Sequence, residues 1–101
     1  MEDYKHKLKL MVAEVFEVDQ EFYLRGRERR RAEMYAKKAF VSLLKKYMLH
    51  TFMDVAKYVG CTEHSSTLYH INDADFMLKY DDNFSFKYRI VEKELLKMME
   101  Q

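Results

Sequence analysis

Apolar residues recur at intervals of three or four along most of the chain, with charged and polar residues between them. In the segment 4–16, Leu8, Met11, Val12 and Val15 fall on one face. That spacing is typical of an amphipathic helix and not of a strand, in which alternate residues would be apolar. Similar spacing recurs over 28–48 and 84–99, and together with capping residues elsewhere it leads us to expect five more helical pieces, over 19–24, 28–48, 51–60, 62–80 and 84–99.

Capping and breaking residues set the limits of these pieces. Thr51 with Asp54 three residues later suits the start of a short helix, and Gly60 suits its end. Thr62 then caps the next helix, and the run 81–83 interrupts the chain before the closing helix, which we expect to fold back onto the core.

Composition supports an all-α fold. The 101 residues contain 2 glycines and no proline, so the residues that usually mark turns and strand ends are nearly absent. Hydrophobic residues make up 49% of the chain, which is enough for one core. We therefore expect a single domain over 1–101, a compact bundle of about six helices.

Several classes of protein are excluded by the same counts. The two glycines, Gly26 and Gly60, are too far apart in the sequence to form a phosphate-binding glycine loop, and one cysteine cannot form an internal disulfide. The first residues lack a signal-peptide pattern, and no apolar run reaches the roughly 20 residues of a membrane helix. These features favour a cytoplasmic protein with no membrane association.

Charge is segregated along the chain although the net charge is only +1. Residues 25–57 hold ten basic and three acidic side chains, while the segments on either side are each net negative. Five arginines fall within the seven residues 25–31. Such a run is often only a solvated surface, but its density of like charge also suits binding to a polyanion.

The helices at 51–60 and 62–80, with Gly60 between them, have the layout of a helix-turn-helix. Helix pairs of this kind are also common as scaffolding. The second helix, however, begins with polar residues that can bond base edges or phosphates. We expect one side of it to expose Ser65, Ser66, Tyr69 and Asp73, and the other side to face the core through Leu68, Ile71 and Leu78.

A more specific signal lies in residues 59–69, Val-Gly-Cys-Thr-Glu-His-Ser-Ser-Thr-Leu-Tyr. This run resembles the Gly-Gly-Arg-Asp-His-Thr-Thr-Val-Leu-His signature of the C-terminal duplex-DNA-binding domain of the bacterial replication initiator DnaA. His64 and Leu68 match that signature, and Glu63, Ser65 and Ser66 are conservative replacements. The resemblance extends over most of residues 8–80.

The resemblance implies a Trp-repressor-like helix-turn-helix domain that binds double-stranded DNA at a short asymmetric box, in replication initiation or its regulation. The implied base-reading residues are Glu63, His64, Ser65, Ser66 and Tyr69, with Arg29 in the minor groove. The implied backbone contacts are Arg27, Arg30, Arg31, Lys37, Lys38, Lys45, Phe52 and Met53. The ATPase module that precedes this domain in the family is absent, so a protein partner would have to supply that activity.

The chain also departs from the family. The family's Arg-Pro-Arg-Gln element is replaced by the proline-free stretch 34–38, and Tyr69 stands where the family has histidine. Asp73 and Asp75 stand where the family has basic residues, and their negative charges would repel DNA phosphate there. An alternative is therefore a protein–protein interaction module that kept the fold and lost specific DNA binding.

Enzymatic and metal-binding functions are not expected. No nucleophile, base and orienting group occur together in a recognisable pattern. Cys61 and His64 form a Cys-x-x-His pair, with Glu63 and His70 nearby, but no second well-spaced pair completes a closed zinc site. We expect no metal and no small-molecule cofactor.

Overall fold

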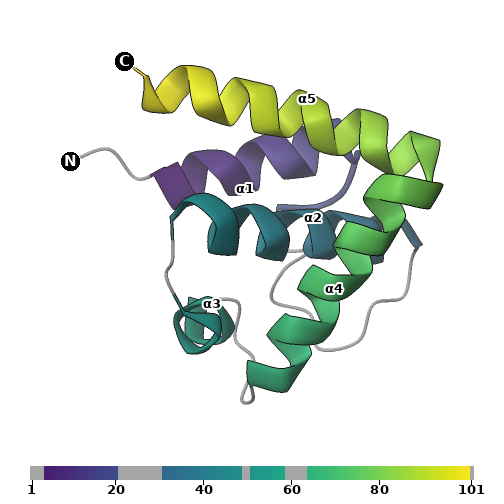
Figure 1. Ribbon diagram of the computed structural model, residues 1–101. Coiled ribbons are helices and arrows are strands. Elements are labelled where there is room, and N and C mark those ends of the chain that lie inside the picture. The colour runs from purple at the N-terminus through teal and green to yellow at the C-terminus, as the bar shows by residue number, and fades with distance from the viewer. Residues whose placement is uncertain (1–3, 21–30, 49–50, 59–63, 101) are drawn as a thin grey trace.

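The computed structural model describes residues 4–20, 31–48, 51–58 and 64–100, and this part of the chain contains helices and no strand. The helices are α1 (Tyr4–Val15), α2 (Arg31–Tyr47), α3 (Phe52–Tyr58), α4 (His64–Tyr80) and α5 (Asp82–Met99). Figure 1 shows α1 and α5 stacked along one side of α2, with α3 and α4 on the other. The expected all-α fold is confirmed.

The core is organised around α2. Every residue from Ala36 to Leu44 is buried, and all four other helices of the described residues contact α2. The helix predicted over 28–48 is therefore the scaffold on which the other helices pack. The other helices contribute buried apolar side chains to the same core, among them Leu8, Val12, Val55, Ala74, Met77, Phe84, Val91 and Leu95.

Helix α1 ends in a left-handed turn formed without glycine. Glu17 has a φ of 57°, the Val18 N–H donates to the Ala13 carbonyl at 2.9 Å, and the Glu17 N–H donates to the Glu14 carbonyl at 3.3 Å. This is the Schellman pattern, in which glycine is the usual residue at the left-handed position. Val18 packs against the core directly afterwards, and this contact stabilises the turn.

Side-chain caps begin α3 and α5. Thr51 Oγ1 accepts a hydrogen bond from the Asp54 N–H at 3.0 Å, as the sequence predicts. Asp81 Oδ1 accepts one from the Phe84 N–H at 3.0 Å. Since Asp81 is the cap, Asp82 is already helical, and the interruption expected over 81–83 is a single residue between α4 and α5.

The described part of the chain contains five helices where six were expected. The short helical turn expected over 19–24 accounts for the difference. Asp19 was expected to cap this turn, and residues 21–24, which would form most of it, lie outside the described residues, as does Thr62, the expected cap of α4.

Helix α5 folds back along α1 and α2, as expected. The Tyr4 hydroxyl donates to the Met98 carbonyl at 3.5 Å, which joins the start of α1 to the end of α5. On the α2 side, Ser42 and Tyr88 share a buried hydrogen bond of 3.0 Å between their hydroxyls.

A small charged network also joins α2 to α5. Lys46 and Tyr47 donate to the same carboxylate oxygen of Glu92, at 2.9 and 2.7 Å. Burial alone would raise the pKa of Glu92, but the hydrogen bonds from Lys46 and Tyr47 outweigh it and lower that pKa below its usual value.

We expect Glu92→Gln to reduce the free energy of unfolding by about 1 kcal/mol at neutral pH, because a hydrogen bond to a charged group is lost. The difference from the wild type should be full above about pH 4.5, the ordinary pKa of glutamate, and should vanish as the pH falls through the lowered pKa of Glu92. Urea denaturation over a pH series measures it. Glu94→Gln on the same helix is the control, and an equal loss in that variant would contradict the prediction.

Candidate nucleic-acid interface

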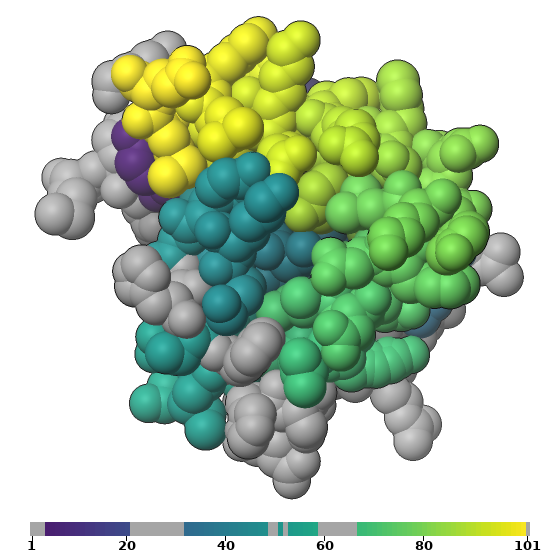
Figure 2. Space-filling view, viewed as in Figure 1, coloured from purple at the N-terminus to yellow at the C-terminus, as the bar shows by residue number. Residues whose placement is uncertain are grey.

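The two helices that make up the candidate interface are α3 and α4. Both pack against α2 and against each other. In Figure 1 α3 is seen nearly end-on while α4 runs across the view, so the two axes cross steeply. Figure 2 shows α4 covering a broad part of one face of the molecule, beside α5.

Helix α4 is rotated relative to the sequence prediction. Its buried side chains are Thr67, Ala74 and Met77, whereas Leu68, expected in the core, is 40% exposed. Ile71 and Leu78 are partly buried, at the margin of the contact. A helix packs closely on its neighbours where its side chains are small, and Thr67 and Ala74 provide that surface toward the core. The prediction for Leu68 was therefore wrong.

Tyr69 lies on the outer side of α4, as expected, and is 56% exposed. Two neighbours hold its ring. The Lys38 ammonium lies 5.6 Å from the ring centroid, and the His70 ring meets it edge-on with centroids 5.6 Å apart. A cation over the ring face and an edge-on ring are both favourable for an aromatic side chain. Tyr69 is thus held in place while its outer side remains open to a partner.

The same lysine makes an ion pair between α2 and α4. Lys38 Nζ lies 3.0 Å from Asp73 Oδ2, with the lysine side chain 3% exposed and the aspartate side chain 34% exposed. The charge of Asp73, which the sequence suggested would repel phosphate, is therefore balanced by Lys38. In turn, Lys38 directs its charge into the α2–α4 contact, and for it to bind phosphate this pair would have to open.

His70 is a second polar residue on the side of α4 that faces α2. Its pKa is lowered from 6.5 to about 4, first by burial and then by the positive charges of Lys37 and Lys38, while Asp73 acts in the opposite direction. Neither His70 Nδ1 nor Thr67 Oγ1, both buried, has a hydrogen-bond partner. The charge of Asp73 does not outweigh burial and the two lysine charges, so His70 is neutral at physiological pH.

Further along α4, two aromatic side chains are exposed that the sequence prediction did not include. Phe76 and Tyr80 follow Tyr69 at helical spacing on the same outer side, and their ring centroids are 4.7 Å apart. We call Tyr69, Phe76 and Tyr80 the aromatic stripe. The spacing of seven and then four residues was the available signal, but aromatic residues at that spacing are normally assigned to a core.

The remaining predicted contacts are distributed over several elements. Lys37 is buried on α2, Lys45 lies half-buried near the end of α2, and Met53 is exposed at the start of α3. Glu63 and the arginines at 27, 29 and 30 lie outside the described residues. For five further predicted contact residues the structure describes a helical backbone but not the side chain: Arg31, Phe52, His64, Ser65 and Ser66.

In comparisons with known proteins, no family model matches the chain, and none of the curated proteins matches it.

Two further findings concern membrane spanning and metal binding. Every helix in the described residues is too short or too polar to cross a membrane. Within the same residues, no group of three or more histidine, cysteine, aspartate or glutamate side chains is placed to hold a metal ion.

The Lys38–Asp73 pair should show strong energetic coupling. We expect Asp73→Asn to cost about 2 kcal/mol of unfolding free energy because it leaves a buried ammonium unpaired, and Lys38→Met to cost less because Asp73 is nearer to solvent. The double variant should be more stable than the sum of the two losses predicts, by about 1–3 kcal/mol. Urea denaturation of all four proteins measures the coupling. Additive losses would contradict it, and Asp75→Asn on the exposed side is the control.

The lowered pKa of His70 predicts a loss of stability in weak acid. The unfolded chain takes up a proton near pH 6.5, whereas the folded chain resists it until about pH 4. The free energy of unfolding should therefore decrease as the pH is lowered from 6.5 to 4, by up to about 1.4 kcal/mol per pH unit. His70→Gln should remove this slope and His6→Gln should keep it, in urea denaturation over that pH range. An unchanged slope in His70→Gln would contradict the prediction.

Proposed function

We propose that this protein binds double-stranded DNA with sequence specificity through α3 and α4, used as a Trp-repressor-like helix-turn-helix. In this proposal the start of α4 reads bases in the major groove, and the arginine-rich segment 25–31 reaches the adjacent minor groove. The role would resemble that of the DnaA duplex-binding domain, in replication initiation or its regulation. A protein partner would supply any ATPase activity that this role requires.

The observation that carries the proposal is the exposure of α4 beside α3. A recognition helix must present one side to the groove while the other side packs on the domain. Helix α4 has this arrangement, with Thr67 buried against the core and Tyr69 exposed two residues later. Since Tyr69 is fixed by Lys38 and His70, it would meet a base edge with little loss of side-chain freedom.

Charge supports the same surface. The segment 25–57, which includes α2 and α3, carries the excess of basic side chains. Lys57 is exposed on α3, next to α4 in the fold. Asp73 is the acidic residue nearest to Tyr69 on α4. Its charge is balanced by Lys38, which reduces its repulsion of DNA phosphate.

The test is a titration of duplex DNA at low salt, with a duplex that carries the DnaA-type box and a scrambled duplex of equal length. We expect Ser65→Ala and His64→Ala to weaken discrimination between the two by about 1–3 kcal/mol, the value of a good base contact. Lys45→Ala should weaken binding to both equally and reduce the slope of the log-log salt plot by about one. Lys93→Ala on α5 changes charge equally and should alter neither.

Two results would overturn the proposal. One is the absence of detectable binding to either duplex at about 50 mM salt, where phosphate contacts are strongest. The other is an equal effect of the base-reading and lysine substitutions on both duplexes, which would remove α4 from base recognition.

A second candidate function is favoured by one observation, the aromatic stripe. Exposed aromatic side chains are enriched at protein–protein interfaces, and Phe76 and Tyr80 lie beyond the turns of α4 that would enter the groove. In a protein-interaction module that lacks specific DNA binding, Phe76→Ser with Tyr80→Ser would abolish partner binding. In the DNA-binding protein the same double substitution should leave the affinity for the box duplex unchanged.

A further inference from the structure

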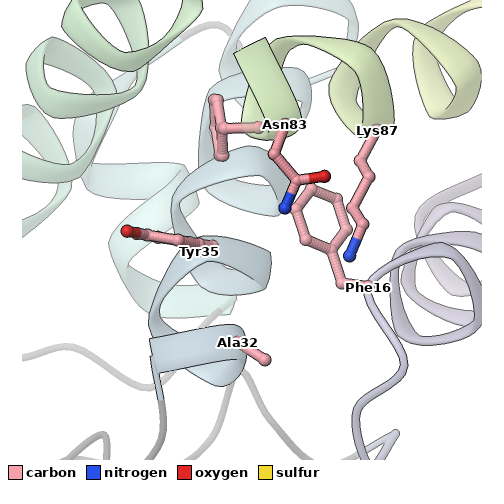
Figure 3. Close-up of a pocket in the computed structure, with 6 residues that line it drawn as sticks. Phe16, Ala32, Tyr35, Asn83 and Lys87 are labelled. Atoms are coloured by element: carbon pink, nitrogen blue, oxygen red, sulfur yellow. The ribbon is translucent and has the colours of Figure 1, made fainter. Parts of the chain in front are cut away.

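The aromatic side chains where α1 meets the start of α5 are covered by the chain itself. Figure 3 shows Lys87 extending from α5 toward the Phe16 ring, and its ammonium lies 5.7 Å from the ring centroid. The rings of Phe16 and Phe84 also pack together, with centroids 6.0 Å apart, and both side chains are almost fully buried. These rings therefore find their contacts within the chain.

The three most exposed aromatic side chains of the described residues lie on either side of the turn between α4 and α5. Phe76 is 59% exposed, Tyr80 is 72% exposed and Phe86 is 68% exposed. Only Asp81 separates the two helices, so Phe86 follows Tyr80 closely. Phe76 points away from the core, because Ala74, two residues earlier on the helix, is fully buried. This patch is left without a cover by the described part of the chain.

The patch is large enough to form the centre of a small interface. An aromatic side chain buries roughly 150–250 Å² when it is fully covered, so these three leave roughly 300–500 Å² exposed on each copy. Two such patches in contact would supply at least half of the roughly 1,200 Å² that the smallest specific interfaces bury in total. Exposed aromatic side chains also contribute strongly to binding where they are buried by a partner. This area suits a weak dimer.

The charges beside the patch are complementary to a second copy of the same surface. Asp75 and Lys79 are exposed on one flank of Phe76 and Tyr80. Their spacing of four residues would allow an ion pair within α4, but they form none, and neither pairs with another described residue. In two antiparallel helices related by a two-fold axis, the same flank of each helix faces the other. Asp75 of one copy then lies level with Lys79 of the other, and symmetry forms this pair twice.

We propose that this protein forms a symmetric homodimer in which the ends of two α4 helices pack antiparallel. The two-fold axis passes the exposed side of α4 at the level of residues 77–78. Phe76 of each copy packs against Tyr80 of the other, and Asp75 pairs with Lys79 on the flank. Phe86 enlarges the apolar patch on each copy. The net charge of the chain is only +1, so two copies repel each other little.

Sedimentation equilibrium of the full chain without DNA tests the dimer. The monomer mass is 12.4 kDa, and the average mass should rise toward twice this value with concentration. We expect a Kd of about 100 µM, as suits an interface near the lower size limit. Phe76→Ser and Tyr80→Ser should each weaken the dimer at least about 10-fold, because each removes two symmetric ring contacts. Leu96→Ser, at an exposed apolar residue far along α5, should leave the Kd unchanged.

Charge reversal tests the orientation of the two helices. Asp75→Lys or Lys79→Glu alone would place like charges opposite each other at both symmetric positions, and should weaken the dimer about 10-fold. The combined variant restores opposite charges and should return the Kd to within about 2-fold of the wild type. Lys93→Glu on α5 changes the net charge as Lys79→Glu does and should have no such effect. Circular dichroism verifies that each variant is folded.

Isotope-filtered NMR of mixed labelled and unlabelled chains locates the contact. Nuclear Overhauser effects between the Phe76 ring of one copy and the Tyr80 ring of the other would support the proposal. A dimer that survives both serine substitutions, or that the combined charge reversal does not restore, would overturn it. A chain that remains monomeric at about 1 mM would also overturn it and leave the patch to a different protein. None of these measurements involves DNA, so failure here and failure of the proposed DNA binding are distinguishable.

Discussion

The complete burial of the middle of α2 is the constraint on which the rest of the structure depends. The nine residues 36–44 include two lysines and a serine, and all of them are removed from water. A buried ammonium or hydroxyl is costly unless another group pairs with it. The neighbouring helices supply such groups, Asp73 from α4 for Lys38 and Tyr88 from α5 for Ser42. Apolar packing holds these helices together, and the polar pairs fix how they are oriented.

The orientation of α4 follows from that constraint. Because Asp73 must reach Lys38, the side of α4 that carries Thr67 and Ala74 turns toward the core. Leu68 is then left in solvent, and the aromatic stripe lies along the outer side. One ion pair on the inner side thus determines which residues of α4 are available for recognition. It also places a lysine beside Tyr69, at the position where the proposed DNA contact begins.

The sequence was sufficient to predict where the helices lie, since their apolar spacing is regular and Thr51 provides a recognisable cap. The arrangement of α4 was harder to predict. Its apolar residues occur on both sides, so Leu68 looked as suitable for the core as Ala74 did. Burial of Lys37 and Lys38 could not be predicted either, because lysine is normally a surface residue. The partner of Lys38, Asp73, is also far along the chain.

The hydrogen bond between Tyr4 and Met98 has a consequence for synthesis on the ribosome. It joins residues 94 positions apart, so α1 is synthesised well before α5, the helix with which it pairs. Helix α5 also contributes Phe84, Tyr88, Val91 and Leu95 to the core. Burial of four such side chains is worth about 6–12 kcal/mol, which is comparable to the whole stability of a small domain. A nascent chain that lacks α5 therefore has too little core to fold, and the domain acquires its structure only after α5 has been synthesised.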